Sequence, residues 1–302
     1  MTDKKSAAAL AAFVLLSLIW GYNWVVMKKV LAFAGPFDFS ALRTLFGALS
    51  LFGVMLLRRQ SLRPRAVGRT VVLGLLQTAA FTALIQSALI SGGAGKTVVL
   101  VYSMPFWLLP MAWIVLGERV RGMQWLAVAL AVAGLLAILE PWGTQGSVLS
   151  SVLALSGGAT WAVSAVLAKR LRQKVALDLL SLTAWQMLFG ALVLCVIALV
   201  VPERPIDPTV YFWGALAFNA LAATGLCWLL WLFILNSLPA AMAGLSSLAI
   251  PVVGVLAAWL ELGERPSGAE ALGMLLVGAA LGVVSLLALR SPRPPQAASS
   301  KR

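Results

Sequence analysis

The feature that most constrains the fold is a succession of ten apolar stretches, each long enough to cross a lipid bilayer as a helix. A membrane-spanning helix needs about 20 mostly apolar residues. Charged residues make up only 11% of the 302 positions, less than half of the roughly 25% found in soluble domains, so the chain cannot cover a water-facing surface. The sequence therefore predicts an all-α integral membrane protein with ten transmembrane helices, at 7–30, 37–57, 68–90, 95–116, 123–139, 147–170, 177–200, 210–235, 240–261 and 268–289.

The basic residues indicate which side of the membrane each connecting segment faces. The chain has 23 Lys and Arg against 10 Asp and Glu. With a cytoplasmic N-terminus, 17 basic residues lie in cytoplasmic segments and 5 in outer segments, the bias that short cytoplasmic loops normally show. We therefore expect a multi-pass plasma membrane protein with both termini in the cytoplasm, namely residues 1–6 and a disordered tail at 291–302. Because topology explains the positive charge, we expect the lipid bilayer and no nucleic acid as its partner.

Several kinds of chemistry are missing from the sequence. The chain has no histidine, which removes histidine metal ligands, general bases and proton relays. The two cysteines, Cys195 and Cys227, both lie in apolar stretches and are expected to be buried thiols without a disulfide. We therefore expect no enzyme activity, no catalytic residue, no metal site and no cofactor.

The two halves of the chain resemble each other. Leu-Gly-Glu-Arg occurs at 116–119 and again at 262–265, and the same offset of 146 relates Pro105 to Pro251. Phe-Gly-Ala-Leu recurs at an offset of 143, at 46–49 and 189–192. Each repeat, 7–140 and 147–290, therefore holds five helices. An odd number of helices makes the second repeat enter the membrane from the opposite side, the inverted-repeat plan of secondary transporters.

These motifs resemble the EamA-type domains of the drug/metabolite transporter superfamily. The resemblance rests on Trp20-Gly21-Tyr22-Asn23, on Pro36 and Arg43, and on the prolines and Leu-Gly-Glu-Arg ends of the fourth and ninth helices. It implies ten helices, inward termini, a central cavity and export of small metabolites, and within the superfamily it is similar to aromatic amino-acid exporters of the YddG type. The second half departs from the pattern, because Gln186 replaces a second Arg43 and Ala162 follows Trp161.

Polar and aromatic residues at membrane depth are the candidate substrate contacts, because such groups usually face a protein interior or a water-filled cavity. Several of them share a helical face, for example Trp20, Asn23 and Trp24. The predicted substrate-binding set is Trp20, Asn23, Trp24, Thr78, Thr82, Tyr102, Ser103, Trp107, Trp161, Ser164, Trp228 and Ser246; Arg43, Pro105 and Pro251 are predicted to serve gating or hinge roles. The alternative is structural, since serine and threonine in membrane helices often bond to backbone or join helices.

The predicted function is secondary transport. We expect a monomer or weak homodimer that exports small amphipathic metabolites, aromatic or other neutral amino acids above all, by alternating access around a cavity near the membrane midplane. No carboxylate lies deep in a predicted helix, and Glu261 comes nearest, so an uncoupled facilitator is expected. The alternatives are a proton-coupled drug/metabolite exporter, a sugar-phosphate or nucleotide-sugar carrier, a lipid flippase and a membrane enzyme.

Overall fold

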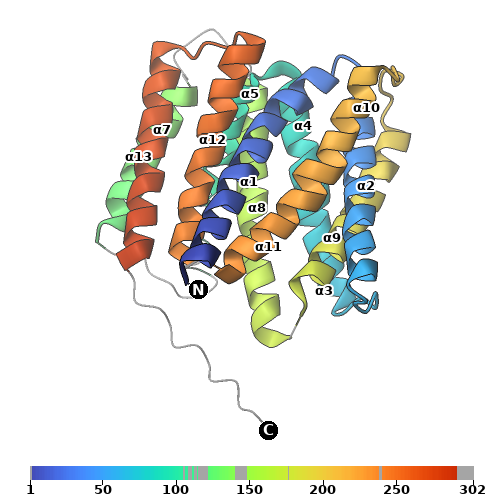
Figure 1. Ribbon diagram of the computed structural model, residues 1–302. Helices are drawn as coiled ribbons and strands as arrows, with labels where there is room; N and C mark the ends of the chain where they lie inside the picture. The colour runs from blue at the N-terminus through green and yellow to red at the C-terminus, as the bar shows by residue number, and fades with distance from the viewer. Residues whose placement is uncertain are drawn as a thin grey trace.

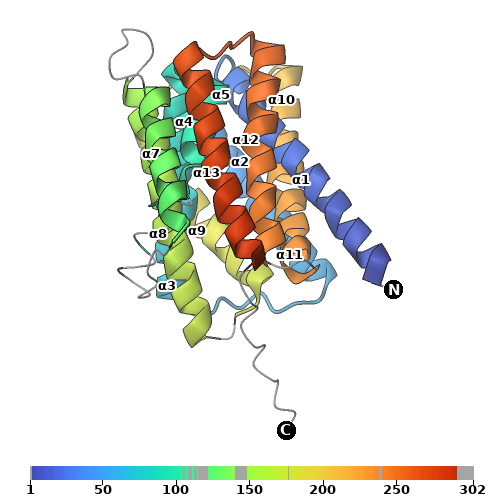
Figure 2. The ribbon, with the colours of Figure 1, turned by 90° about the vertical axis from the view of Figure 1, so that its left-hand side faces the viewer.

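A computed structural model describes residues 2–104, 106–107, 111, 114, 122–139, 148–175, 177–237 and 240–290, and the secondary structure of these residues is helical throughout, without strands. The helices form a bundle (Figures 1 and 2). Its elements are α1 Thr2–Val30, α2 Pro36–Leu57, α3 Val67–Leu73, η1 Gly74–Ala80, α4 Phe81–Ser91, α5 Ala94–Val101, α7 Gln124–Leu139, α8 Val148–Lys174, α9 Leu179–Val200, α10 Val210–Ala217, η2 Phe218–Leu226, α11 Cys227–Ser237, α12 Ala240–Leu262 and α13 Gly268–Arg290.

Six segments in the described residues are long and apolar enough to cross a membrane. They are Ala11–Val30, Pro36–Leu57, Val67–Ser91, Val148–Lys174, Leu179–Val200 and Val210–Trp231. Shorter apolar helices occupy Gln124–Ile138, Ala249–Leu262 and Gly268–Val283. The prediction of an all-helical membrane protein is therefore confirmed. The total of ten helices and the inverted repeat remain predictions.

Two of the six spans contain a π-helical segment in the middle. The first span runs from α3 through η1 into α4, and the second from α10 through η2 into α11. A π-helix is rare and usually appears as a single wide turn inside an α-helix, often at a functional site. Both segments fall within predicted spans, 68–90 and 210–235. The sequence therefore predicts the spans that contain these segments but not their π-helical geometry.

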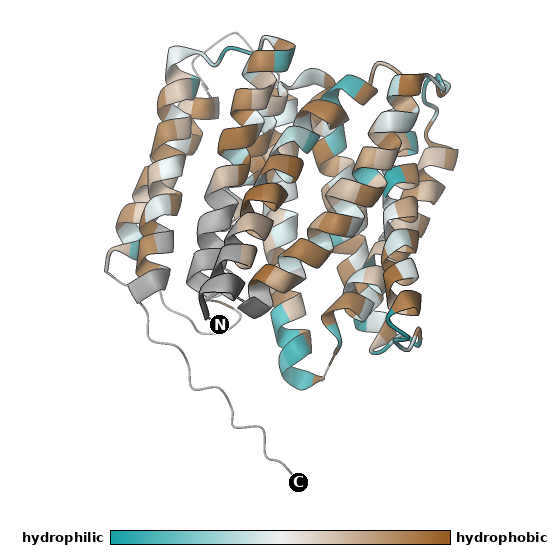
Figure 3. Ribbon diagram, viewed as in Figure 1, coloured by the Kyte–Doolittle hydropathy of each residue, from teal (hydrophilic) through white to brown (hydrophobic). Residues whose placement is uncertain are grey.

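The side-chain pattern agrees with a surface in contact with lipid. Large apolar side chains such as Leu57, Leu199 and Val210 are almost fully exposed, while Phe39, Leu51 and Phe212 are fully buried. Figure 3 shows apolar residues along most of the helix lengths and hydrophilic residues gathered at the helix ends and in the loops. A soluble protein would not expose so much apolar surface, so a multi-pass membrane location follows.

The bundle has two chemically different ends. One end, at the bottom of Figure 1, holds the connection from α2 to α3 (residues 58–66) and the C-terminal end of α8; we call it the arginine-rich end, because residues 58–69 contain five arginines. The opposite end holds the connections from α1 to α2 and from α12 to α13. We call it the ion-paired end, because Lys29 pairs with Glu261 and Lys96 with Glu270 there.

Candidate functional site

A cluster of three tryptophans joins α1 to α11. The indole Nε1 of Trp20 donates a hydrogen bond to the carbonyl oxygen of Ala223 in η2, at 2.7 Å. The Trp20 ring lies edge-on to Trp228, with ring centres 6.2 Å apart, and 6.3 Å from Trp231 at a tilt of 42°. The predicted residues Trp20 and Trp228 are thus brought together. Trp231 was missed, although its position three residues after Trp228 places both on one helical face.

Three buried amides carry oxygen atoms with no hydrogen-bond donor among the described residues. They belong to Asn23 in α1, Gln86 in α4 and Asn219 in η2. Gln86 donates from Nε2 to the carbonyl of Met27, one turn after Asn23, and Asn219 donates from Nδ2 to the carbonyl of Ala215.

The elements that carry these three amides pack together at α1. Met27 places Gln86 beside α1, while the ring contact of Tyr22 with Phe218, 6.1 Å between centres, places the start of η2 beside the same helix. A buried polar atom without a partner costs about 1–3 kcal/mol. One unpaired acceptor oxygen on α1 and two more on elements packed against it therefore favour a ligand group that donates hydrogen bonds. Of these three, only Asn23 was in the predicted set.

The predicted Thr78 packs closely against a neighbouring helix, and so does Thr224, 146 residues later. A Cβ atom at Gly190 of α9 would collide with the side chain of Thr78, and a Cβ atom at Gly47 of α2 would collide with Thr224. Each threonine therefore fits against the bare backbone of a neighbouring helix, as small residues do where membrane helices approach closely. Thr82 is buried one turn after Thr78.

The predicted residues after α5 form a short hydrogen-bonded chain. Ser103, fully buried, donates from Oγ to the carbonyl of Leu100 at 2.6 Å, and it accepts from the indole Nε1 of Trp107 at 3.1 Å. Tyr102 beside it is buried. Ser103 thus bonds to its own backbone, the structural alternative for a membrane serine, and it holds the ring of Trp107 in place at the same time.

The remaining predicted residues take different positions. Trp24 is buried in the main apolar core, and Trp161 is half-buried on α8. Ser164 donates to the carbonyl of Trp161 in its own helix at 2.7 Å. Pro105 and the side chain of Ser246 lie outside the described part of the chain.

The two predicted gating residues that the structure describes are Arg43 and Pro251. Arg43 is half-buried in α2, and its Nε has no hydrogen-bond partner among the described residues. Pro251 is buried inside α12, where α1 passes very close: a Cβ atom at Gly21 would lie 2.5 Å from Val253 and 3.0 Å from the carbonyl oxygen of Ile250. Gly21 is therefore required by the crossing of α1 over α12.

The ion-paired end holds charged contacts that the sequence analysis did not predict, since it considered Glu261 only as a possible ion-coupling group. Lys29 of α1 binds Glu261 of α12 at 2.6 Å, and the Tyr22 hydroxyl donates to the same carboxylate at 3.2 Å. Lys28 donates to the carbonyl oxygens of Leu89 and Gly92 where α4 ends. These contacts join α1 to helices from both halves of the chain.

Two carboxylates at the same end cap helices that are remote in sequence. Glu264 accepts hydrogen bonds from the backbone N–H groups of Ala94 and Gly95, both at 3.0 Å, where α5 begins. Glu203 accepts from the N–H groups of Phe37 and Asp38 where α2 begins. The first N–H groups of a helix lack partners within the helix, and they attract negative charge.

Comparison with known proteins gives consistent results. A sequence model of the EamA-like transporter family matches residues 7–140 and again 148–286. The chain is 28% identical over 269 residues to YoaV, an uncharacterized transporter of Bacillus subtilis, with 87% of this chain and 91% of the relative covered. It is 27% identical over 278 residues to a probable amino-acid metabolite efflux pump of Escherichia coli, with 87% and 90% covered.

The chain also resembles a solved crystal structure. The two superimpose with a TM-score of 0.68 and 20% sequence identity, over 94% of this chain and 99% of the other. A likeness at this level of identity shows a shared fold.

Proposed function

Because this chain belongs to the EamA-like transporter family, we propose that it is a membrane exporter of small amphipathic metabolites, with aromatic or other neutral amino acids as the preferred substrates. The family and the relatives are transporters rather than enzymes. That one relative is a probable amino-acid metabolite efflux pump supports this substrate class.

The observation that carries the proposal is the pairing of an aromatic cluster with unpaired acceptor oxygens. Trp20, Trp228 and Trp231 offer ring faces and edges against which an apolar or aromatic side chain packs. The amide oxygens of Asn23 and Gln86 accept hydrogen bonds that an ammonium group donates. An amino acid carries both features, whereas a phosphate-bearing substrate needs several buried cations. In the described interior of the bundle, Arg43 is the arginine available for that role.

We propose that the chain forms ten helices in two inverted five-helix repeats. Support comes from matched features in the two halves. The π-helical segments η1 and η2 are separated by about the repeat offset, since Thr78 and Thr224 lie 146 residues apart. Thr78 packs on Gly190 as Thr224 packs on Gly47, so each threonine meets the second helix of the other half.

We also propose that transport proceeds by alternating access. The ion pair between Lys29 and Glu261 joins α1 to α12 at the ion-paired end. We propose that this contact holds that end closed and that substrate leaves when it opens. The positive charge at the arginine-rich end favours a cytoplasmic location for that end and for both termini.

Uncoupled transport follows from the positions of the carboxylates. Glu261 and Glu264 lie near the ion-paired end and are bonded there, and in the described residues no three Asp, Glu or Cys side chains group into a metal-binding set. Proton- and sodium-driven transporters normally place an ion-binding carboxylate in the membrane interior. The chain is therefore proposed to move substrate down its own gradient.

Transport into vesicles tests this function. Purified protein in liposomes is assayed with radiolabelled tryptophan, leucine and the deaminated analogue of each. We expect the amino acids to equilibrate without accumulating, the deaminated analogues to move at least tenfold more slowly, and an imposed pH or sodium gradient to leave the end point unchanged. Equal rates for analogues and amino acids would refute the role of the acceptor oxygens, and accumulation driven by a gradient would refute uncoupled transport.

A further inference from the structure

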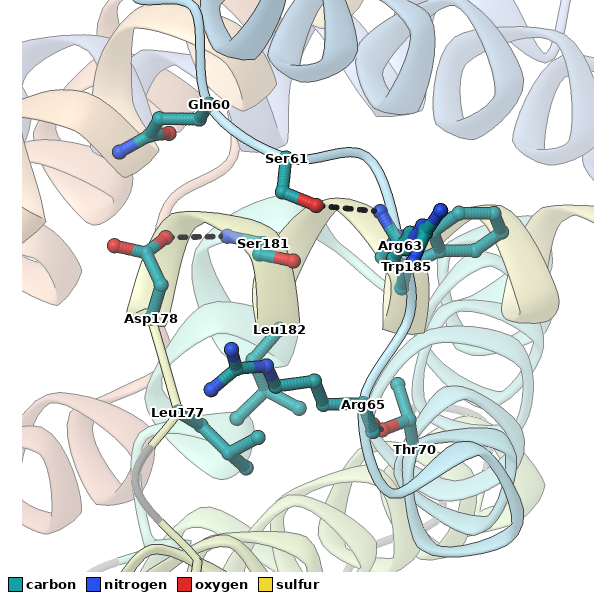
Figure 4. Close-up of a pocket in the computed structure, with 10 residues that line it drawn as sticks. All are labelled: Gln60, Ser61, Arg63, Arg65, Thr70, Leu177, Asp178, Ser181, Leu182 and Trp185. Atoms are coloured by element: carbon teal, nitrogen blue, oxygen red, sulfur yellow. Dashed lines mark hydrogen bonds between the residues drawn. The ribbon is translucent and has the colours of Figure 1, made fainter.

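A preformed pocket at the arginine-rich end lies apart from the site described above. It has a volume of about 230 Å³ and opens between the connection 58–66 and the start of α9 (Figure 4). Its lining is Gln60, Ser61, Arg63, Arg65, Thr70, Leu177, Asp178, Ser181, Leu182 and Trp185. The tryptophan cluster of Trp20 shares no residue with it.

The walls of the pocket are held in place by hydrogen bonds. The indole Nε1 of Trp185 donates to the carbonyl of Leu62 at 3.1 Å, and the hydroxyl of Thr70 donates to the carbonyl of Arg65 at 3.1 Å. The connection begins and ends at residues in the left-handed region, Arg59 with φ of 52° and Ala66 with φ of 50°. Non-glycine residues take this conformation at a cost, and such strain is typical of segments with a specific role.

The charges in the pocket suit an anionic group. Two arginines line it, Arg63 and Arg65, and the guanidinium of Arg65 extends toward the side where Leu177 and Asp178 lie (Figure 4). Asp178 is engaged as the N-cap of α9, where its Oδ1 accepts from the N–H of Ser181 at 2.8 Å. The hydroxyl groups of Ser61 and Ser181 add neutral polar groups. Arginine binds phosphate well, because its planar fork matches two phosphate oxygens.

The level of the pocket in the bundle favours a lipid. It lies where three apolar spans end or begin, at Leu57 of α2, Val67 of α3 and Leu179 of α9. Leu57 is 86% exposed, and Leu62 and Val67 are also exposed. These three apolar side chains, here called the apolar rim, lie on and at the ends of the connection that lines the pocket. A tryptophan with its N–H bonded at this level is typical of the membrane–water interface.

At the ion-paired end, the connection after α9 contacts the start of α2, and this contact can be compared with the pocket at the arginine-rich end. The connection after α9 supplies Glu203, whose carboxylate accepts hydrogen bonds from the start of α2. The connection after α2 reaches the start of α9 in the same way, but it supplies arginines instead of a carboxylate. The general excess of basic residues in cytoplasmic segments explains why this connection is positively charged. It does not explain why two of its arginines line a pocket.

We propose that this pocket binds the phosphate group of a ligand, carried either by a phospholipid headgroup or by soluble phosphate. The two guanidinium groups bind the phosphate oxygens, and the apolar rim accommodates acyl chains when the ligand is a lipid. This binding site does not depend on the proposed transport function, and its test requires no transport.

The test measures binding to the purified full-length chain in detergent. The probes are phosphatidylglycerol, diacylglycerol with the same acyl chains and inorganic phosphate, and the readouts are the unfolding midpoint and the number of lipids retained in native mass spectrometry. We expect phosphatidylglycerol to raise the midpoint by several degrees and diacylglycerol to leave it unchanged. A full shift with inorganic phosphate alone would identify soluble phosphate as the ligand, whereas a shift with phosphatidylglycerol alone would identify the lipid.

Two matched double variants locate the binding. The pair Arg63→Gln and Arg65→Gln should weaken phosphatidylglycerol binding at least tenfold, since it removes both charge-assisted hydrogen bonds to the phosphate. The pair Arg58→Gln and Arg69→Gln removes the same charge from residues outside the pocket lining and should retain binding. Equal losses in both pairs, or a shift produced by diacylglycerol, would overturn the proposal.

A third variant allows the test to be made if the glutamine pair does not fold. If the glutamine pair does not fold, Arg63→Lys with Arg65→Lys keeps the charge but loses the planar fork. Binding weakened severalfold in this variant supports the pocket, and unchanged binding overturns it.

Discussion

Neutralising the ion pair between Lys29 and Glu261 should open the ion-paired end more often. The pair joins α1 to α12 at 2.6 Å, and its side chains are 37% and 31% exposed. Solvent screens a pair at this exposure, so its contribution is about 0.2–1 kcal/mol. If the pair exists only in the closed state, the population open at this end rises by about 1.4- to 5-fold when the pair is lost.

The assay is the reaction rate of a single cysteine below the pair. Asn23→Cys, in a chain whose Cys195 and Cys227 are replaced by serine, lies about 9 Å deeper than Lys29 along α1 by helical rise. A membrane-impermeant thiol reagent is added on the side that the ion-paired end faces. Because Asn23 is buried, its substitute should react only when this end opens. Lys29→Gln and Glu261→Gln should each raise the rate by the expected 1.4- to 5-fold.

The double variant decides whether the two residues act as a pair. Lys29→Gln combined with Glu261→Gln should react no faster than either single variant, because one interaction is removed in all three. Arg204→Gln removes an exposed charge from the same end and should leave the rate unchanged. Fully additive increases in the double variant, or an equal increase with Arg204→Gln, would refute the reasoning.

Three further predictions follow from the contacts. Trp20→Ala should reduce uptake of tryptophan into liposomes at least tenfold at equal protein levels, because it removes the hydrogen bond to η2 and two ring contacts. The control is Trp213→Ala, since the Trp213 side chain is 55% exposed; equal losses in both variants would show that Trp20 has only a packing role. Gly190→Ala should lower the free energy of unfolding by about 1–3 kcal/mol through overpacking, measured by thermal unfolding, whereas Gly53→Ala has open space around its Cβ and should not destabilise the protein. A reporter fused after Arg290 should be active on the cytoplasmic side, and an outer location would contradict the ten-helix topology.

The spans could be predicted from the sequence because membrane helices are defined by length and apolarity alone. The predicted stretches 37–57 and 177–200 match α2 and α9 within two residues. The faces of single helices were also predictable, since Trp20 and Trp228 each lie on a polar or aromatic face. Their meeting was not predictable, because it depends on how α1 crosses α11.

The parts of the site that were missed depend on long-range contacts. Gln86 and Asn219 are single amides in apolar stretches, and only the structure places both beside α1. Thr78 was predicted to contact substrate because it is polar and at membrane depth; the structure adds that its side chain packs against the bare backbone of Gly190, a contact between helices that the sequence does not reveal. The π-helical geometry of η1 and η2 leaves no periodicity in the sequence that differs from an α-helix.

The capping carboxylates have a consequence for the assembly of the chain. Glu203 and Glu264 belong to the second half, and they satisfy helix starts in the first half. A polypeptide that ended at residue 140 would leave those N–H groups of α2 and α5 unbonded, and Gly47 would lose its packing contact with Thr224. Either half made alone would therefore lack contacts that the joined chain has, so the two halves are expected to fold and assemble together.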